Sequence, residues 1–198
     1  MARKSWMYAV LEAVQYEMRQ DKNMVWIFEL TPPVASTPGK PVINLEKEFG
    51  RNRVVNTGID ENWMAGCVLG AGLAGSKAAT YIPYQGACMP FQMIQNHVGK
   101  LRHMTGGQAT MPIVFIMEMT GQTPGFAGQH SDYEIDTYYA HIPGVKTVIP
   151  SNPTDAKGMM VSAIRSPDPV VYLYAAGLRD LIEDVPDNQY ETPLDKAA

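Results

Sequence analysis

Glu61 is the acidic residue best placed for chemistry, because it stands at the start of a long apolar stretch rich in glycine. Residues Arg53–Gly75 predict a short strand, a tight turn and a helix that begins at Glu61. Gly66 and Gly70 lie four apart within this helix, although glycine costs a helix roughly 1 kcal/mol relative to alanine. Their spacing indicates that another backbone packs closely along the same face. A carboxyl group at the edge of such an interface could bind and exchange a proton.

Glu61 and the histidines each have a simpler interpretation. An acidic residue in the first turn of a helix is favoured by the helix dipole, and Asp60 could cap the same helix. His130 lies in a glycine-bearing loop, where an exposed imidazole can transfer protons near neutral pH, or can be an ordinary surface histidine. His141 precedes the Pro143-Gly144 turn and is interpreted as structural.

The composition excludes several classes of protein. The chain has 198 residues and a net charge of −4, which argues against a nucleic-acid partner. No apolar run approaches the roughly 18–20 residues of a membrane span, and Glu12 interrupts the apolar N-terminal stretch. Cys67 and Cys88 indicate reduced core thiols and are too few for a zinc site, so a cytoplasmic protein is expected. Asp155 and Lys157 are expected to cap a helix and face solvent.

Apolar runs of strand length alternate with helical patterns along the chain. Strands are expected at 24–30, 53–56, 78–83, 112–119, 143–150 and 170–174. Helices are expected at 5–19, 61–75, 89–104, 133–140 and 153–165, with a short one that ends at Gly50. This alternation predicts an α/β fold, a single three-layer domain with a mainly parallel sheet and helices on both faces. The polar, proline-bearing residues 179–198 are expected to form a linker or C-terminal arm.

Four stretches carry a resemblance to a known family. The spacing Glu61-x4-Gly66-Cys67-x2-Gly70 is followed by KLRHMTGGQATMPIVFI, by QHSDYEIDTYYAHIPGVKTVIPSNPTDAKG and by EDVPDNQYETPLDKA. In this order they resemble the N-terminal, pyrimidine-binding domain of the E1 component β subunit of thiamin diphosphate-dependent 2-oxo acid dehydrogenases, a transketolase-like family. The resemblance implies that residues 1–178 form this domain.

The resemblance also implies a site. Glu61 would hydrogen-bond and activate the cofactor aminopyrimidine, with Ile59 and Tyr84 as further cofactor-binding residues and His130 as a catalytic residue at the mouth of the site. No metal ligand is expected on this chain, because it lacks the Gly-Asp-Gly…Asn signature for magnesium and diphosphate. Mg²⁺ and the diphosphate would be held by an α-type partner subunit. A separate chain would supply the family's C-terminal transketolase domain, and a lipoyl or other acyl carrier would accept the product.

The chain departs from the family on the substrate side, where the loop before His130 reads GQTPGFAGQH. The expected function is therefore a subunit of a split enzyme that decarboxylates a 2-oxo acid and transfers the acyl or aldehyde unit. One alternative is a transketolase-like or acyloin-forming carboligase of a biosynthetic pathway. Another is a non-catalytic assembly subunit. The presence of Glu61 together with Gly66 and Gly70 at the family's spacing argues against this alternative.

Overall fold

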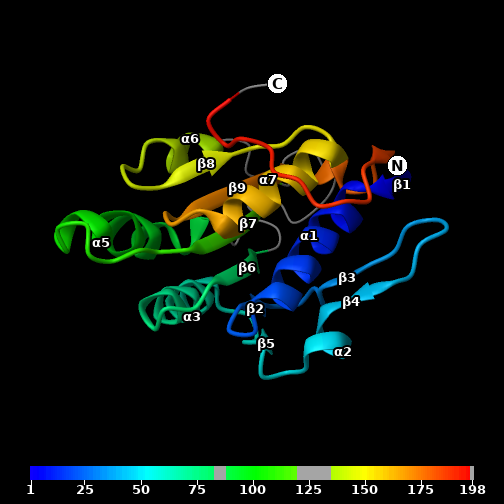
Figure 1. The fold of residues 1–198 in the computed structure, drawn as a ribbon. Coiled ribbons are helices and arrows are strands. Elements are labelled where there is room, and N and C mark those ends of the chain that lie inside the picture. Colours follow the sequence, from blue (N-terminus) through cyan, green and yellow to red (C-terminus); the bar gives the residue numbers. More distant parts are fainter. Residues whose placement is uncertain (83–87, 120–134, 197–198) are drawn as a thin grey trace.

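A parallel sheet forms the centre of the molecule. The computed structural model describes residues 1–82, 88–119 and 135–196. Six strands have the order β5-β2-β6-β7-β9-β8, and all neighbouring pairs are parallel (Figure 1). They are β2 (Val25–Phe28), β5 (Val54–Asn56), β6 (Ala78–Ile82), β7 (Ile113–Met119), β8 (Lys146–Val148) and β9 (Val170–Ala175). Continuous apolar runs suit strands that are covered on both faces.

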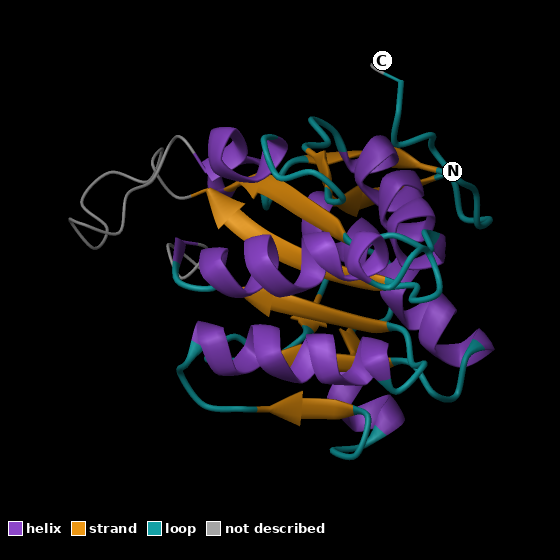
Figure 2. Ribbon diagram, turned by 90° about the vertical axis from the view of Figure 1, so that its left-hand side faces the viewer, coloured by secondary structure: helices purple, strands orange, loops and turns teal. Residues whose placement is uncertain are grey.

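Helices cover both faces of this sheet, which confirms the predicted three-layer α/β fold. On one face α1 (Trp6–Gln20) and α7 (Pro153–Arg165) pack together over the sheet. On the other face lie α3, the α4–η2–α5 helix and α6, which lie in front of the strands in Figure 2. Their bounds are α3 (Glu61–Leu73), α4 (Phe91–Met93), the π-helix η2 (Ile94–Val98), α5 (Gly99–Met104) and α6 (Ile135–Ala140). Among the helices of the described residues, none combines the length and the apolar character needed to span a bilayer.

Side-chain caps fix where the main helices begin. The Ser5 hydroxyl accepts a hydrogen bond from the Tyr8 amide, and the Asn152 side chain accepts one from the Asp155 amide just ahead of Pro153. Asn44 caps the short helix α2 (Leu45–Phe49), which ends at Gly50 as predicted. Each cap satisfies an amide that has no partner inside its helix. These polar residues therefore set the boundaries that the apolar pattern alone leaves open.

Several short elements were not predicted. Residues 89–104 form no single α-helix, since the π-helical turn Ile94–Val98 interrupts them. Two-residue strands, β3 (Val34–Ala35) and β4 (Ile43–Asn44), pair with each other in the segment between β2 and α2. A 3₁₀ turn, η4 (Ala176–Leu178), leads to β10 (Ile182–Val185), which pairs antiparallel with β1 (Ala2–Ser5). The segment that follows β10 lies against α7, so both ends of the described chain meet on one face.

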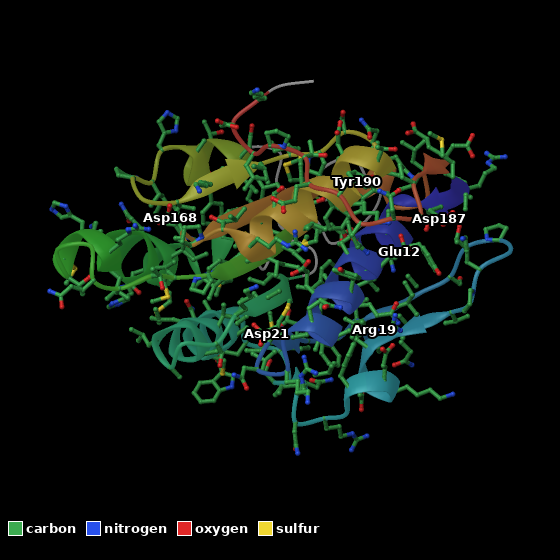
Figure 3. The ribbon with its side chains drawn as sticks, in the orientation of Figure 1. Glu12, Arg19, Asp21, Asp168, Asp187 and Tyr190 are labelled. Carbon is green, nitrogen blue, oxygen red and sulfur yellow. The ribbon has the colours of Figure 1, made fainter. Side chains whose placement is uncertain are left out.

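A buried charge cluster joins these two ends. The Nζ atoms of Lys4 and Lys157 each lie 2.8 Å from the same Glu12 oxygen, and both lysine side chains are fully buried. Lys157 also donates to the carbonyl oxygens of residues 186, 187 and 188 at 2.8, 3.3 and 3.0 Å. Figure 3 shows Glu12, Asp187 and Tyr190 gathered where α1 meets the C-terminal segment. The prediction that Lys157 faces solvent is therefore wrong, because its ammonium group binds this segment.

Candidate functional site

The carboxyl ends of the parallel strands bring two glutamates together. Glu29 directly follows β2, and Glu61 opens α3, which follows the neighbouring strand β5. Ligands of open parallel sheets bind at this edge, where the strands end and the helices begin. The sequence pointed to Glu61 alone at this place, and the structure adds Glu29.

Glu61 is the first residue of α3, as the sequence predicted. Asp60 caps the helix, since its carboxylate accepts the Trp63 amide at 2.9 Å. Asp60 therefore satisfies a free amide of the first turn, and that task does not fall to Glu61. The half-buried Glu61 carboxylate makes no hydrogen bond or ion pair with the rest of the described chain. It is thus available to a group that lies outside these residues.

Glu29 is a buried acid beside Glu61. Its side chain is 1% exposed, and its Oε2 atom accepts a hydrogen bond from the Asp60 amide at 3.0 Å. Burial raises the pKa of Glu29 to about 7, and the negative charge of Glu61 adds to this effect. The hydrogen bond from Asp60 acts in the opposite direction because it favours the ionised form. Glu29 can therefore exchange its proton near neutral pH.

Glu29 was not predicted as a site residue because it is the last but one residue of the apolar run MVWIFEL, whose pattern is typical of a buried strand. One signal could have identified it. A lone carboxylate at the carboxyl end of a buried parallel strand lies at the edge where ligands bind. Such a residue is either ion-paired or has a shifted pKa, because an isolated buried charge is costly.

The structure tests some of the other residues discussed from the sequence and leaves two of them as predictions. Ile59 lies between β5 and α3 and is 68% exposed, so its apolar side chain is open to an external group. Tyr84 and His130 lie outside the described residues and stay predictions. The His141 Nδ1–H donates a hydrogen bond to the Thr137 carbonyl oxygen at 2.7 Å, in keeping with its structural interpretation.

The outer face of α3 is apolar and open. A Cβ atom added to Gly66 or Gly70 would meet nothing within 4 Å, whereas one on Gly72 would lie 2.6 Å from the Met111 sulfur. Trp63 and Leu73 on the same helix are each 60% exposed. The close approach predicted at Gly66 and Gly70 is therefore not made within the described part of the chain, and this face remains accessible to another backbone. Cys67 and Cys88 were expected to lie in the core. Both are half-buried and pack against the core from its edge.

The described part of the chain also bears on metal binding and on the position of hollows at its surface. It contains no group of three or more His, Cys, Asp or Glu side chains that could hold a metal ion. A hollow of about 960 Å³ lies at the opposite edge of the sheet, where Met111, Val145 and Pro169 precede strands β7, β8 and β9. It does not include Glu29 or Glu61.

Comparisons with known proteins identify a family whose members are similar to this chain in sequence. The model of the transketolase pyrimidine-binding domain family matches residues 2–178. The chain is 33% identical over 201 residues to the pyruvate dehydrogenase E1 component subunit beta of Bacillus subtilis. It is 33% identical over 209 residues to the acetoin:2,6-dichlorophenolindophenol oxidoreductase subunit beta of Cupriavidus necator. Both alignments cover 100% of this chain, which spans 60% and 61% of the two relatives.

A solved structure shares the fold at low sequence identity. It is described as a split gene transketolase, an inactive beta4 tetramer, and superposes with a TM-score of 0.69 at 14% identity. The superposition covers 95% of this chain and 56% of that one. On the match of the family model over nearly the whole chain, this protein belongs to the transketolase pyrimidine-binding domain family.

Proposed function

We propose that this chain supplies the pyrimidine-binding half of a thiamin diphosphate site in a multi-subunit enzyme that acts on a 2-oxo acid. Glu61 is the residue that activates the cofactor, and Glu29 supports it. The observation that carries the proposal is the pairing at the carboxyl edge of the sheet. A carboxylate at the start of α3, with no partner among the described residues, lies beside a buried carboxyl group with a pKa near 7.

The residues present fit the aminopyrimidine ring. A ring nitrogen that shares a proton needs a carboxyl group with no competing partner, and Glu61 has no such partner among the residues that the structure describes. The ring also has apolar faces, and the exposed side chain of Ile59 lies beside Glu61 in the chain. Thiamin diphosphate, when bound, supplies the carbon nucleophile that attacks the substrate carbonyl group.

The chain's own residues then hold and move protons. Glu61 shares a proton with the ring nitrogen N1′ through its carboxyl oxygens. Glu29 is protonated for part of the time at neutral pH, so it lowers the negative charge that faces Glu61. The Asp60 amide holds Glu29 in place, and the capped start of α3 fixes the direction of Glu61. His130 remains the proposed proton-transfer residue toward the substrate, and Tyr84 the proposed aromatic contact.

The diphosphate and Mg²⁺ are assigned to an α-type partner chain, because this sequence lacks the motif that binds them. The names of the relatives support a subunit of a larger assembly, and the compounds in those names, pyruvate and acetoin, support a short oxo compound as substrate. The chain spans about 60% of those relatives, so we assign the family's C-terminal domain to a further chain or segment. The group that accepts the transferred unit distinguishes the two candidate reactions. A lipoyl acceptor would make the enzyme a dehydrogenase, and an aldehyde acceptor would make it a carboligase.

Calorimetry tests the shared site. Thiamin diphosphate and Mg²⁺ are titrated into the purified chain and, separately, into the complex that an affinity-tagged form of the chain retains from its source. The complex should bind the cofactor in the micromolar range, and the chain alone should not. Tight binding by the isolated chain, or none by a complex that contains an α-type subunit, would refute the shared site.

A further inference from the structure

Leu30 adopts an unusual backbone conformation directly after Glu29. Its φ is +49°, and it is the sole non-glycine residue with a positive φ in the described ranges. A side chain with a Cβ is crowded in this left-handed region, which glycine occupies freely. The Leu30 side chain is 54% exposed, so burial of apolar surface gives little compensation for this strain.

The conformation of Leu30 turns the chain sharply at the end of β2. The Thr31 amide donates a hydrogen bond back to the Glu29 carbonyl oxygen, across Leu30. Pro32 and Pro33 follow, and neither can donate a backbone hydrogen bond. The strand therefore stops at Phe28, and Glu29 is left at the edge of the sheet instead of within a longer strand.

The turn and the start of α3 hold Glu29 from two sides. The Leu30 turn fixes the backbone of Glu29, while the Asp60 amide binds its carboxylate at 3.0 Å. The charged groups that act on this carboxyl group are Glu61 and Asp60, both at the start of α3. A strained backbone conformation persists only where the surrounding structure holds it in place, and such conformations are concentrated at functional sites.

We propose that Leu30 is a positioning residue, whose left-handed turn keeps the Glu29 carboxyl group buried against the start of α3 and facing Glu61. The position of Glu29 is a property of the chain alone. Its use in catalysis rests on the proposed function.

Two substitutions separate the turn from the side chain. Glycine at position 30 allows the same backbone conformation, whereas valine strongly disfavours it because of its branched Cβ. The titration of Glu29 is followed by NMR in the full chain with carboxyl-labelled glutamate, and the Glu29→Gln variant assigns the signal. Leu30→Gly should keep the midpoint near that of the wild type and raise the melting temperature by about 2–4 °C. Leu30→Val should lower the midpoint by about one pH unit or more, and hydrogen exchange of the Asp60 amide should become at least about tenfold faster.

Leu73→Val is the matched control, since Leu73 is 60% exposed at the last position of α3, and it should change neither the midpoint nor the exchange rate. An unchanged midpoint and exchange rate in Leu30→Val would overturn the proposal. If that variant does not fold, Leu30→Gly decides, because a lowered midpoint there would show that the leucine side chain, not the turn, positions Glu29. No cofactor or partner is present in these measurements, so their outcome is independent of whether the proposed catalytic function holds.

Discussion

The Glu29 carboxylate and the backbone amide of Asp60 lie 3.0 Å apart, and this hydrogen bond joins the end of strand β2 to the start of helix α3. The bond fixes a buried acid beside Glu61, on the edge of the sheet where ligands of this fold class bind. The two glutamates come from segments 32 positions apart in the sequence, and only the parallel pairing of β2 with β5 brings them together.

Glu29 should make the stability of the chain depend on pH. Its pKa is raised from 4.5 to about 7, so the folded state binds more protons than the unfolded state between these values. Stability is therefore fully present below about pH 4.5 and falls as the pH rises through 7, by at most about 3 kcal/mol. Chemical denaturation across this range should show the fall in the wild type. Glu29→Gln should largely remove it.

Glu183→Gln is the matched control, because Glu183 is a half-buried residue of β10 whose carboxylate has no bonding partner in the described chain. It should leave the pH dependence as in the wild type. An equal fall in wild type and Glu29→Gln would contradict the assignment of the raised pKa to Glu29.

Substitutions of the α3 glycines should affect the stability of the isolated chain and the assembly of the complex in different ways. Gly66→Ala should stabilise the isolated chain by about 0.5–1 kcal/mol, since the added methyl group meets nothing and alanine favours helices. Gly72→Ala should destabilise it, because the methyl group would overlap the Met111 side chain. Assembly of the purified complex is then measured by sedimentation, with both variants compared at the same fraction of folded chain. Gly66→Ala should weaken assembly, and Gly72→Ala should not. Unchanged assembly of Gly66→Ala and of Gly66→Leu would exclude this face as an interface.

Lys157 should hold the C-terminal segment in place. Lys157→Met keeps the apolar stem but removes three bonds to backbone carbonyl groups and the ion pair with Glu12. We expect a loss of about 2–4 kcal/mol in unfolding free energy, together with faster hydrogen exchange in residues 186–192. Lys40→Met removes an exposed pair with Asp187 and should have little effect on either measurement. Slow exchange of residues 186–192 in Lys157→Met would show that other contacts hold the segment.

Sequence patterns predicted the sheet and the main helices because buried parallel strands and capped helices leave local signals. Glu61 with its Asp60 cap is an example, as the helix start and the glycine spacing can be read within ten residues. Glu29 was missed since its role depends on a neighbouring strand and helix. Lys157 was misread because its partners, Glu12 and the backbone near Pro186, lie far away in the sequence. The pairing of β1 with β10 joins residues about 180 positions apart and has no local signal.

The proposed function depends above all on activation of the cofactor by Glu61. The most direct test is the rate of deuterium exchange at C2 of bound thiamin diphosphate, followed by NMR in the assembled complex for the wild type and for Glu61→Gln. Glutamine keeps the size of the side chain but cannot share an acid proton with the ring nitrogen. Exchange should slow by about 10²-fold or more, while the melting temperature and the assembly stay unchanged. Exchange at the wild-type rate in Glu61→Gln would contradict the account and return Glu61 to the role of a helix-start charge.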